Sequence, residues 1–282
     1  MTDNVAEQVA THYAPSDLRS RVSSVLEAAG KDGTNTGVLD LASLDQSHVM
    51  GTLATRRLAE RAGVRDSYDV IDVGAGMGGP ARFLAATYGC HVTGVDITPP
   101  YLETAEYLTE LTNLSHLVSF RQAEATSLPF VDETFDLGWT QHAVQNVDDK
   151  ERFFGELRRV LRPGAKAVVH DLYRGRSGDV HFPAMWARDE SASFLISDAD
   201  MRAVIEASGF QIVDWIDGTQ EAWDSNAKRA AGDVNAREGQ IAVPGLDISL
   251  LHGQNWMEMA GNSVKDFEVG SVGIFEAILS RT

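Results

Sequence analysis

The sequence has a single cysteine and little positive charge, and each shortage excludes a class of protein. Cys90 is the only thiol among 282 residues, so no intrachain disulfide can form and a disulfide-stapled secreted scaffold is excluded. Lys and Arg number 24 against 41 Asp and Glu, which gives a formal net charge of −17. A protein with this charge repels a polyphosphate backbone, so we expect no nucleic-acid partner.

Long apolar runs and a targeting segment are also lacking. No stretch approaches the roughly 18 apolar residues that a membrane-spanning helix needs. The amino terminus, M-T-D-N-V-A-E-Q, has neither the basic nor the apolar region of a secretion signal. We therefore expect a cytoplasmic protein with no membrane partner. The composition leaves open the oligomeric state and whether the acidity reflects a salt-adapted host.

Helical and strand patterns alternate along the chain and predict an α/β fold. Three segments with helical periodicity precede the first strand. In the third of them Leu53, Leu58 and Ala62 can share one face of a helix. Apolar strands separated by helices pair in parallel with right-handed crossovers, which predicts a doubly wound, seven-stranded, mostly parallel sheet. The expected helices before the sheet are 5–13, 16–29 and 47–62, and the expected strands are 69–73, 91–95, 118–121, 135–139, 167–170, 210–215 and 273–279.

The chain is expected to form a single domain over residues 1–282, because no low-complexity or Pro-rich linker interrupts it. Two stretches, 174–196 after the fifth strand and the one that begins at residue 216, are much longer than ordinary connections, whose median is about 4–6 residues. Long insertions of this kind are usually lids, binding loops or added helices. We therefore expect an N-terminal helical cap at 1–62, a cofactor-binding core at 69–171, and lid or substrate insertions at 174–196 and 216–260.

A glycine-rich turn follows the first strand. Gly74, Gly76 and Gly79 have the spacing G-x-G-x-x-G, which lets a ligand approach the backbone closely at the mouth of the sheet. Asp96 ends the second strand, where a carboxylate can accept hydrogen bonds from both hydroxyls of a ribose. The turn and this carboxylate together predict a cofactor that carries a nucleoside.

Two further carboxylates favour a cationic cofactor. Asp72 lies two residues before the first glycine, where it would repel a pyrophosphate but could orient a cation. Glu124 follows the third strand and can accept a hydrogen bond from an adenine amino group. These charges favour S-adenosylmethionine (SAM), which carries a sulfonium and an ammonium and no phosphate.

At these residues the sequence resembles the class I SAM-dependent methyltransferases. Within them it looks most like the small-molecule branch that includes ubiquinone/menaquinone and sarcosine/dimethylglycine methyltransferases. The matching blocks are D-V-G-A-G-M-G-G at 72–79, G-V-D at 94–96, A-E-A-T-S-L-P-F at 123–130, F-D-L-G-W-T-Q-H at 135–142, R-R-V-L-R-P-G-A at 158–165, D-Q-S-H-V-M-G-T-L-A-T at 45–55 and the G-I-F-E-A-I-L ending.

The resemblance implies a last strand antiparallel to the other six and a set of residues around the cofactor. It places His48 over the cofactor as a roof and Gln141 near the sulfonium. The other implied cofactor contacts are Asp72, Gly74, Ala75, Gly76 and Gly79 at the methionine moiety, Asp96 at the ribose, and Ile97, Glu124 and Ala125 at the adenine.

Three residues at the strand ends are candidates for proton transfer. His142 follows the fourth strand, and its ordinary pKa near 6.5 would let it accept a proton at neutral pH; it could also be a wall residue. His170 and Asp171 end the fifth strand at the same rim and are either catalytic or turn anchors. Because T-Q-H-A stands where some O-methyltransferases have acidic metal ligands, we expect no metal.

The sequence therefore predicts an enzyme that transfers a methyl group from SAM to a small-molecule acceptor by direct in-line displacement. An amine nitrogen is favoured as the acceptor atom over oxygen or carbon. We expect the N-terminal helices with Tyr13 and the two insertions to close over one pocket. A nicotinamide-dependent oxidoreductase and a non-catalytic cofactor-binding subunit are the alternatives.

Overall fold

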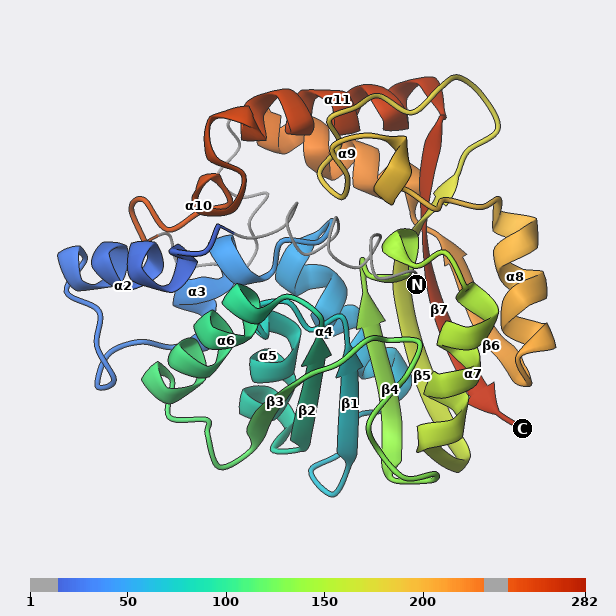
Figure 1. Cartoon of the computed structure of the whole chain (residues 1–282), viewed down its shortest axis with the longest axis horizontal. Coiled ribbons are helices and arrows are strands. Elements are labelled where there is room, and N and C mark those ends of the chain that lie inside the picture. The colour runs from blue at the N-terminus through green and yellow to red at the C-terminus, as the bar shows by residue number, and fades with distance from the viewer. Residues whose placement is uncertain (1–14, 231–242) are drawn as a thin grey trace.

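The computed structural model describes residues 15–230 and 243–282, and a seven-stranded sheet lies at its centre (Figure 1). The strands lie in the order β3-β2-β1-β4-β5-β7-β6. β7 runs antiparallel to β5 and β6, whereas the other neighbouring strands are parallel. This confirms the predicted fold. The strands are β1 (Asp69–Val73), β2 (His91–Asp96), β3 (Val118–Gln122), β4 (Phe135–Gln141), β5 (Leu161–Arg174), β6 (Phe210–Asp217) and β7 (Val272–Arg281).

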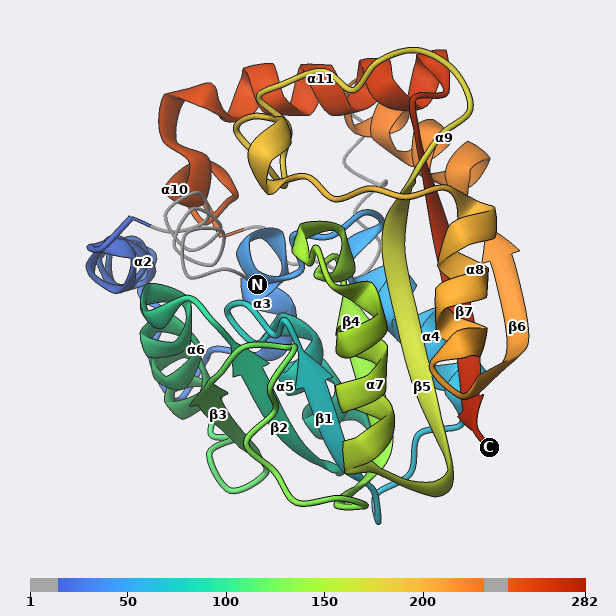
Figure 2. The same cartoon turned by 45° about the vertical axis from the view of Figure 1, so that its right-hand side comes forward.

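Helices cover both faces of the sheet (Figure 2). Buried side chains of α4 and α5 pack on one face and those of α7 and α8 on the other. The helices are α2 (Leu18–Ala28), α3 (Val38–Asp45), α4 (Gly51–Ala62), α5 (Gly79–Tyr88), α6 (Pro99–Leu111), α7 (Lys150–Val160), α8 (Asp198–Ala207), α9 (Thr219–Ala230), α10 (Ser249–His252) and α11 (Trp256–Val269), with 3₁₀ turns η1 (Val144–Asn146), η2 (Glu190–Ala192) and η4 (Gly253–Asn255).

The apolar runs of the central strands follow from burial on both faces. In β1, Val70 packs towards α4 and α5, whereas Ile71 and Val73 pack towards α7 and α8. A parallel strand covered on both sides needs apolar side chains on both of its faces rather than an alternating pattern. At the start of α7, Asp149 caps the helix, because its side chain accepts a hydrogen bond from the Arg152 amide at 2.9 Å.

The structure corrects several details of the sequence-based elements. Leu53 does not share the buried face of Leu58 and Ala62, and it is 38% exposed. Five residues separate Leu53 from Leu58, which turns their side chains about 140° apart around the helix axis. Helix α3 was not predicted. The helix expected at 5–13, with Tyr13, lies outside the described residues.

A layer of helices lies above the carboxyl ends of the parallel strands (Figures 1 and 2). It consists of α9, α10, α11 and the connection that follows β5, and an apolar cluster that includes Trp186, Ala222, Phe267 and Ile274 ties it to β7. α2 and α3 pack together beside α6, whereas α4 covers the sheet itself. No described helix is both long and apolar enough to cross a membrane.

Candidate active site

A cavity of about 890 Å³ lies between the carboxyl ends of the strands and the overlying helices. Its floor includes the glycine turn, and α10 and α11 contribute to its upper wall. The predicted site residues that line it are His48, Gly74, Ala75, Gly76, Asp96, Ile97, Ala125, Gln141 and His142. The predicted site residues not among its lining residues are Asp72, Gly79, Glu124, His170 and Asp171.

The glycine turn presents bare backbone to the cavity. Gly74 and Gly76 have φ of +80° and +53°, a left-handed conformation that glycine adopts without the steric cost of a side chain. A Cβ at Gly74 would overlap the Cβ of Ala143 after β4. α5 begins directly after the turn, and its amino-terminal end favours negative groups such as a ligand carboxylate.

Asp96 connects the end of β2 to the glycine turn. Its Oδ2 accepts a hydrogen bond from the Gly76 amide at 2.8 Å, and its Oδ1 accepts one from the Thr98 amide at 2.9 Å. Each carboxylate oxygen has a further lone pair, so the group can still accept a hydrogen bond from a ribose hydroxyl. Asp96 therefore fixes the turn and lines the cavity at once.

Asp72 lies buried behind the turn. Its Oδ2 has no hydrogen-bond partner in the described part of the chain. Burial and the nearby charge of Asp96 raise the pKa of Asp72 to about 8. A cation bound near the turn would stabilise the ionised carboxylate. The bare turn, the free lone pairs of Asp96 and this buried acid fit a cofactor that has a ribose and positive charge.

We predict that Asp72→Asn changes how stability depends on pH. In the wild type, the buried acid stays protonated up to about pH 8 but ionises near pH 4 in the unfolded chain. Its contribution to stability is therefore full below pH 4 and is lost as the pH rises towards 8, by up to about 1.4 kcal/mol per pH unit.

Urea unfolding of both cofactor-free proteins between pH 5 and 8 measures this effect. The free energy of unfolding of Asp72→Asn, relative to wild type, should increase with pH. Asp69→Asn, on the same strand but exposed, is the matched control and should show no such trend. Parallel pH curves for Asp72→Asn and wild type would mean that Asp72 is already ionised in the folded protein.

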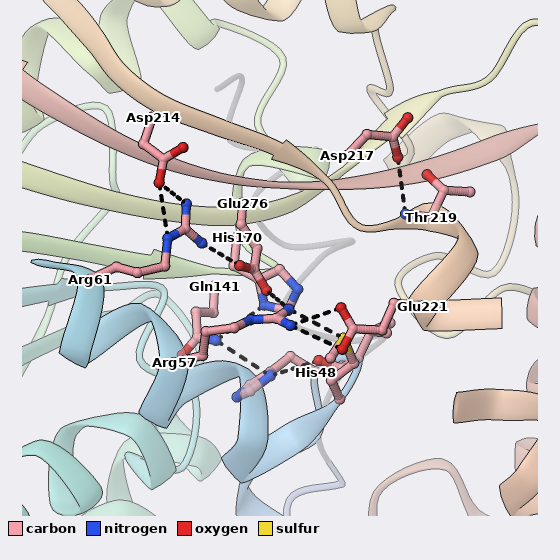
Figure 3. Close-up of polar contacts among 12 residues, drawn as sticks. His48, Arg57, Arg61, Gln141, His170, Asp214, Asp217, Thr219, Glu221 and Glu276 are labelled. Carbon is pink, nitrogen blue, oxygen red and sulfur yellow. Dashed lines mark hydrogen bonds and ion pairs between the residues drawn. The ribbon is translucent and has the colours of Figure 1, made fainter. Parts of the chain in front are cut away.

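Three histidine rings lie close together near Gln141 at the end of β4, with the centroid of His142 6.0 Å from that of His48 and 5.1 Å from that of His170. Figure 3 shows Gln141 with His48 and His170. The Gln141 Oε1 accepts hydrogen bonds from the Trp139 indole at 2.9 Å and the Thr55 hydroxyl at 3.2 Å. Its amide nitrogen lies 3.1 Å from the His170 Nδ1. Because both ends of the amide are engaged, Gln141 is held in one orientation at the cavity wall.

His48 enters the same network from the segment after α3. Its Nε2 lies 2.9 Å from the Gln46 Oε1, which also accepts from the Thr55 hydroxyl at 2.8 Å. Burial lowers the pKa of His48 to about 4, so the ring is neutral at physiological pH. Gln46 and Thr55 were not singled out from the sequence, although both lie in the block at 45–55.

His142 is held in a conformation that few residues other than glycine adopt. Its φ is +54°, its amide donates to the His170 carbonyl oxygen at 2.8 Å, and its carbonyl oxygen accepts from the Gln145 side chain at 3.0 Å. Burial and the neighbouring His48 lower the pKa of His142 to about 3. The expectation of an ordinary pKa near 6.5 was therefore wrong, and the ring is neutral over the whole physiological range.

His170 and Asp171 lie behind the cavity wall. His170 is 1% exposed, and burial holds its pKa well below the ordinary value. Asp171 accepts hydrogen bonds from the amides of Ala143 and Val144 at 2.9 and 2.8 Å, so its carboxylate holds the turn that carries His142. This placement favours positioning functions for both residues over direct proton transfer.

A buried acid on β7 completes the network beneath the histidines (Figure 3). Glu276 is paired with His170 across β5 and β7 and is 1% exposed. Its carboxylate forms ion pairs with Arg57 and Arg61 of α4, and Arg57 also contacts Glu221 of α9 at 2.8 Å. These long-range pairs join α4, β7 and α9, and no local sequence signal marks them.

The described residues contain no group of three or more His, Cys, Asp or Glu side chains placed to hold a metal ion. Metal independence stays a prediction.

Comparisons with known proteins agree with the site. A family model described as "Methyltransferase domain" matches residues 71–169. The chain is 28% identical over 225 residues to Methyltransferase GfsG of Streptomyces halstedii, which covers 78% of this chain and 79% of that protein. It is 36% identical over 237 residues to Sterol methyltransferase-like 2 of Botryococcus braunii, which covers 78% of this chain and 60% of that protein.

A solved structure of geranyl diphosphate methyltransferase in complex with GPP and sinefungin has the same fold. It matches with a TM-score of 0.70 at 16% identity, over 99% of this chain and 100% of that chain. The matched family model spans the turn, the Asp96 strand end and the Gln141 strand end that form the cavity floor. The chain therefore belongs to the class I SAM-dependent methyltransferases of the small-molecule type.

Proposed function

We propose that this methyltransferase methylates a hydroxyl group of a large apolar molecule. One observation carries the proposal: among the described residues that line the cavity, none is a lysine or arginine. A carboxylate or phosphate on the acceptor would lose its hydration there without gaining a cation as partner. Membership in the family excludes the nicotinamide-dependent alternative and makes methyl transfer the activity to test.

The upper wall of the cavity supports an apolar acceptor. It is built mainly from apolar and aromatic side chains of the overlying segments, among them Met185, Trp186, Ile248, Leu251, Trp256, Val264 and Phe267. Pockets for single drug-sized ligands span about 300–1,000 Å³. A cavity of about 890 Å³ lies near the top of that range, as expected where a second molecule binds beside a cofactor.

The protonation of His142 favours oxygen over an amine nitrogen. An alkyl ammonium must lose its proton before its nitrogen can attack, and a base whose conjugate acid has a pKa of about 3 is a poor acceptor for that proton. A hydroxyl group enters the cavity uncharged. As its oxygen bonds to the methyl carbon, the oxygen gains positive charge and its proton becomes strongly acidic. A weakly basic imidazole suffices for that step, so the proposal departs from the amine favoured by the sequence.

The chain itself supplies alignment, exclusion of water and a proton acceptor. SAM, when bound, supplies a methyl group on a positively charged sulfur. We place the methionine moiety on the glycine turn, the ribose at Asp96, and Ile97 and Ala125 beside the adenine. Gln141 and His142 then form the wall between cofactor and acceptor, and the segments above them keep water from the reacting atoms.

Relatives support a large acceptor. Sterol methyltransferase-like 2 is named for sterols, which are bulky and mostly apolar. The sarcosine-type resemblance would instead suggest a small charged amine. For such a substrate the described cavity offers no Lys or Arg to bind the carboxylate.

An acceptor panel tests the proposal, with release of S-adenosylhomocysteine (SAH) as the readout. The matched set is 2-naphthol, 2-(aminomethyl)naphthalene and 2-naphthoic acid, with sarcosine as the small zwitterion. We expect turnover of 2-naphthol alone, and NMR of the product locates the methyl group. Preferred turnover of sarcosine or the aminomethyl compound would contradict the proposal.

A further inference from the structure

Asp45 lies directly over the glycine turn. It is the last residue of α3, it is 6% exposed, and it lines the cavity. A Cβ placed on Gly79 would overlap the Asp45 carbonyl oxygen and would lie 3.0 Å from the Asp45 carboxyl carbon. The end of α3 therefore rests on the start of α5, next to the part of the turn where the methionine moiety is expected.

Within the described part of the chain, one oxygen of this carboxylate is engaged and the other is not. Asp45 Oδ2 forms an ion pair with the Arg82 Nη2 at 2.6 Å, and Arg82 is completely buried. Arg82 also donates to the backbone oxygens of Met77 at 2.6 Å and Ala105 at 3.1 Å. Asp45 Oδ1 has no hydrogen-bond partner among the described residues. A buried acceptor left unpaired costs stability, so a ligand that supplies a donor would bind favourably beside it.

We infer that Asp45 binds the ammonium group of the cofactor's methionine moiety. The inference rests on the proposed placement of that moiety at the glycine turn. The other carboxylates among the described lining residues have different surroundings. Asp96 holds two backbone amides, and Asp266 in the upper wall is bonded to His181 at 2.6 Å and Ser271 at 2.8 Å.

Arg82 is the positioning residue for this contact. It fixes Oδ2 and ties Asp45 to the turn through the Met77 carbonyl, so Oδ1 is left for a second cation. An ion pair at this depth is stable only when its hydrogen bonds are satisfied. The ammonium would supply the bond that Oδ1 lacks.

Two ligands separate the ammonium contact from the rest of the cofactor site. SAH carries the ammonium but no sulfonium, and 5′-methylthioadenosine has the same nucleoside without the amino acid part. Calorimetry should show that Asp45→Asn weakens SAH binding by about 10- to 100-fold, because a charge-assisted hydrogen bond is lost. The affinity for 5′-methylthioadenosine should change less than about twofold on the same reasoning.

Variants of two other acidic residues serve as controls. Asp40→Asn changes a buried acid of the same helix that pairs with Lys31 at 2.8 Å and does not line the cavity, and it should leave both affinities unchanged. Asp96→Ala should weaken both ligands, since both contain the ribose. Equal losses for the two ligands in Asp45→Asn, or no loss for SAH, would overturn the inference.

A second variant keeps the test informative if Asp45→Asn alone fails to fold. Asp45→Asn leaves Arg82 as a buried cation without its partner, so we pair it with the double change Asp45→Asn and Arg82→Gln, which replaces the ion pair by two amides. The double variant should also lose the preference for SAH, and retention of that preference would overturn the inference. If neither ligand bound the wild-type protein, the proposed placement of the cofactor would be wrong.

Discussion

Gly79→Ala is expected to lower both the stability of the protein and its affinity for SAM. The added Cβ would overlap the carbonyl oxygen of Asp45 and lie 2.6 Å from its carbonyl carbon. Both are backbone atoms, so a side-chain rotation cannot relieve the clash, and α3 must move away from the glycine turn. Overpacking of this kind costs about 1–3 kcal/mol.

The free energy of unfolding and the affinity for SAH measure this prediction. We expect the affinity to fall by about 10-fold or more, because a charge-assisted bond to Asp45 would be lost as α3 moves. Gly155→Ala is the matched control: Gly155 lies within α7 with nothing within 4 Å of its Cβ position. That change should stabilise the protein by about 0.5–1 kcal/mol. A Gly79→Ala protein as stable as wild type would show that α3 does not rest on the turn.

The parts of the site that could be predicted from the sequence are local. The glycine turn, Asp96 and Gln141 each adjoin a strand end, and parallel strands bring their carboxyl ends to one edge of the sheet. Asp96 and Gly76 illustrate this, since they are separated by 20 residues but belong to adjacent strand ends and are hydrogen-bonded. The periodic strands thus sufficed to place the cavity floor.

The parts that could not be predicted depend on contacts between distant segments. Asp45 and Arg82 are 37 residues apart, and nothing in either local sequence indicates that they form a buried pair. His170 and Asp171 were expected at the rim, but β5 continues to Arg174 and pairs with β7 from Lys166 to Arg174. This pairing places both side chains within the packed structure. The protonation of His142 likewise depends on burial, which a single sequence does not reveal.

His142→Asn is expected to lower turnover by about 100-fold, the lower end of the usual contribution of a positioned proton acceptor, because the ring is weakly basic. Asparagine tolerates the left-handed conformation at φ +54°, so the variant removes the imidazole with little backbone strain. Affinity for SAH should stay nearly unchanged, because we assign His142 to the acceptor and not to the cofactor. Turnover of 2-naphthol and calorimetry with SAH give the two measurements.

The control and the pH profile show whether His142 accepts the proton. His91→Ala, which changes an exposed histidine at the amino end of β2, should leave turnover unchanged. Because the pKa of His142 is about 3, its protonation should not reduce wild-type turnover between pH 5 and 8. A fall in turnover below about pH 6.5 that disappears in His142→Asn would contradict a neutral His142 ring. Unaltered turnover in His142→Asn would make the residue a wall of the acceptor site, and loss of SAH binding would place it in the cofactor site instead.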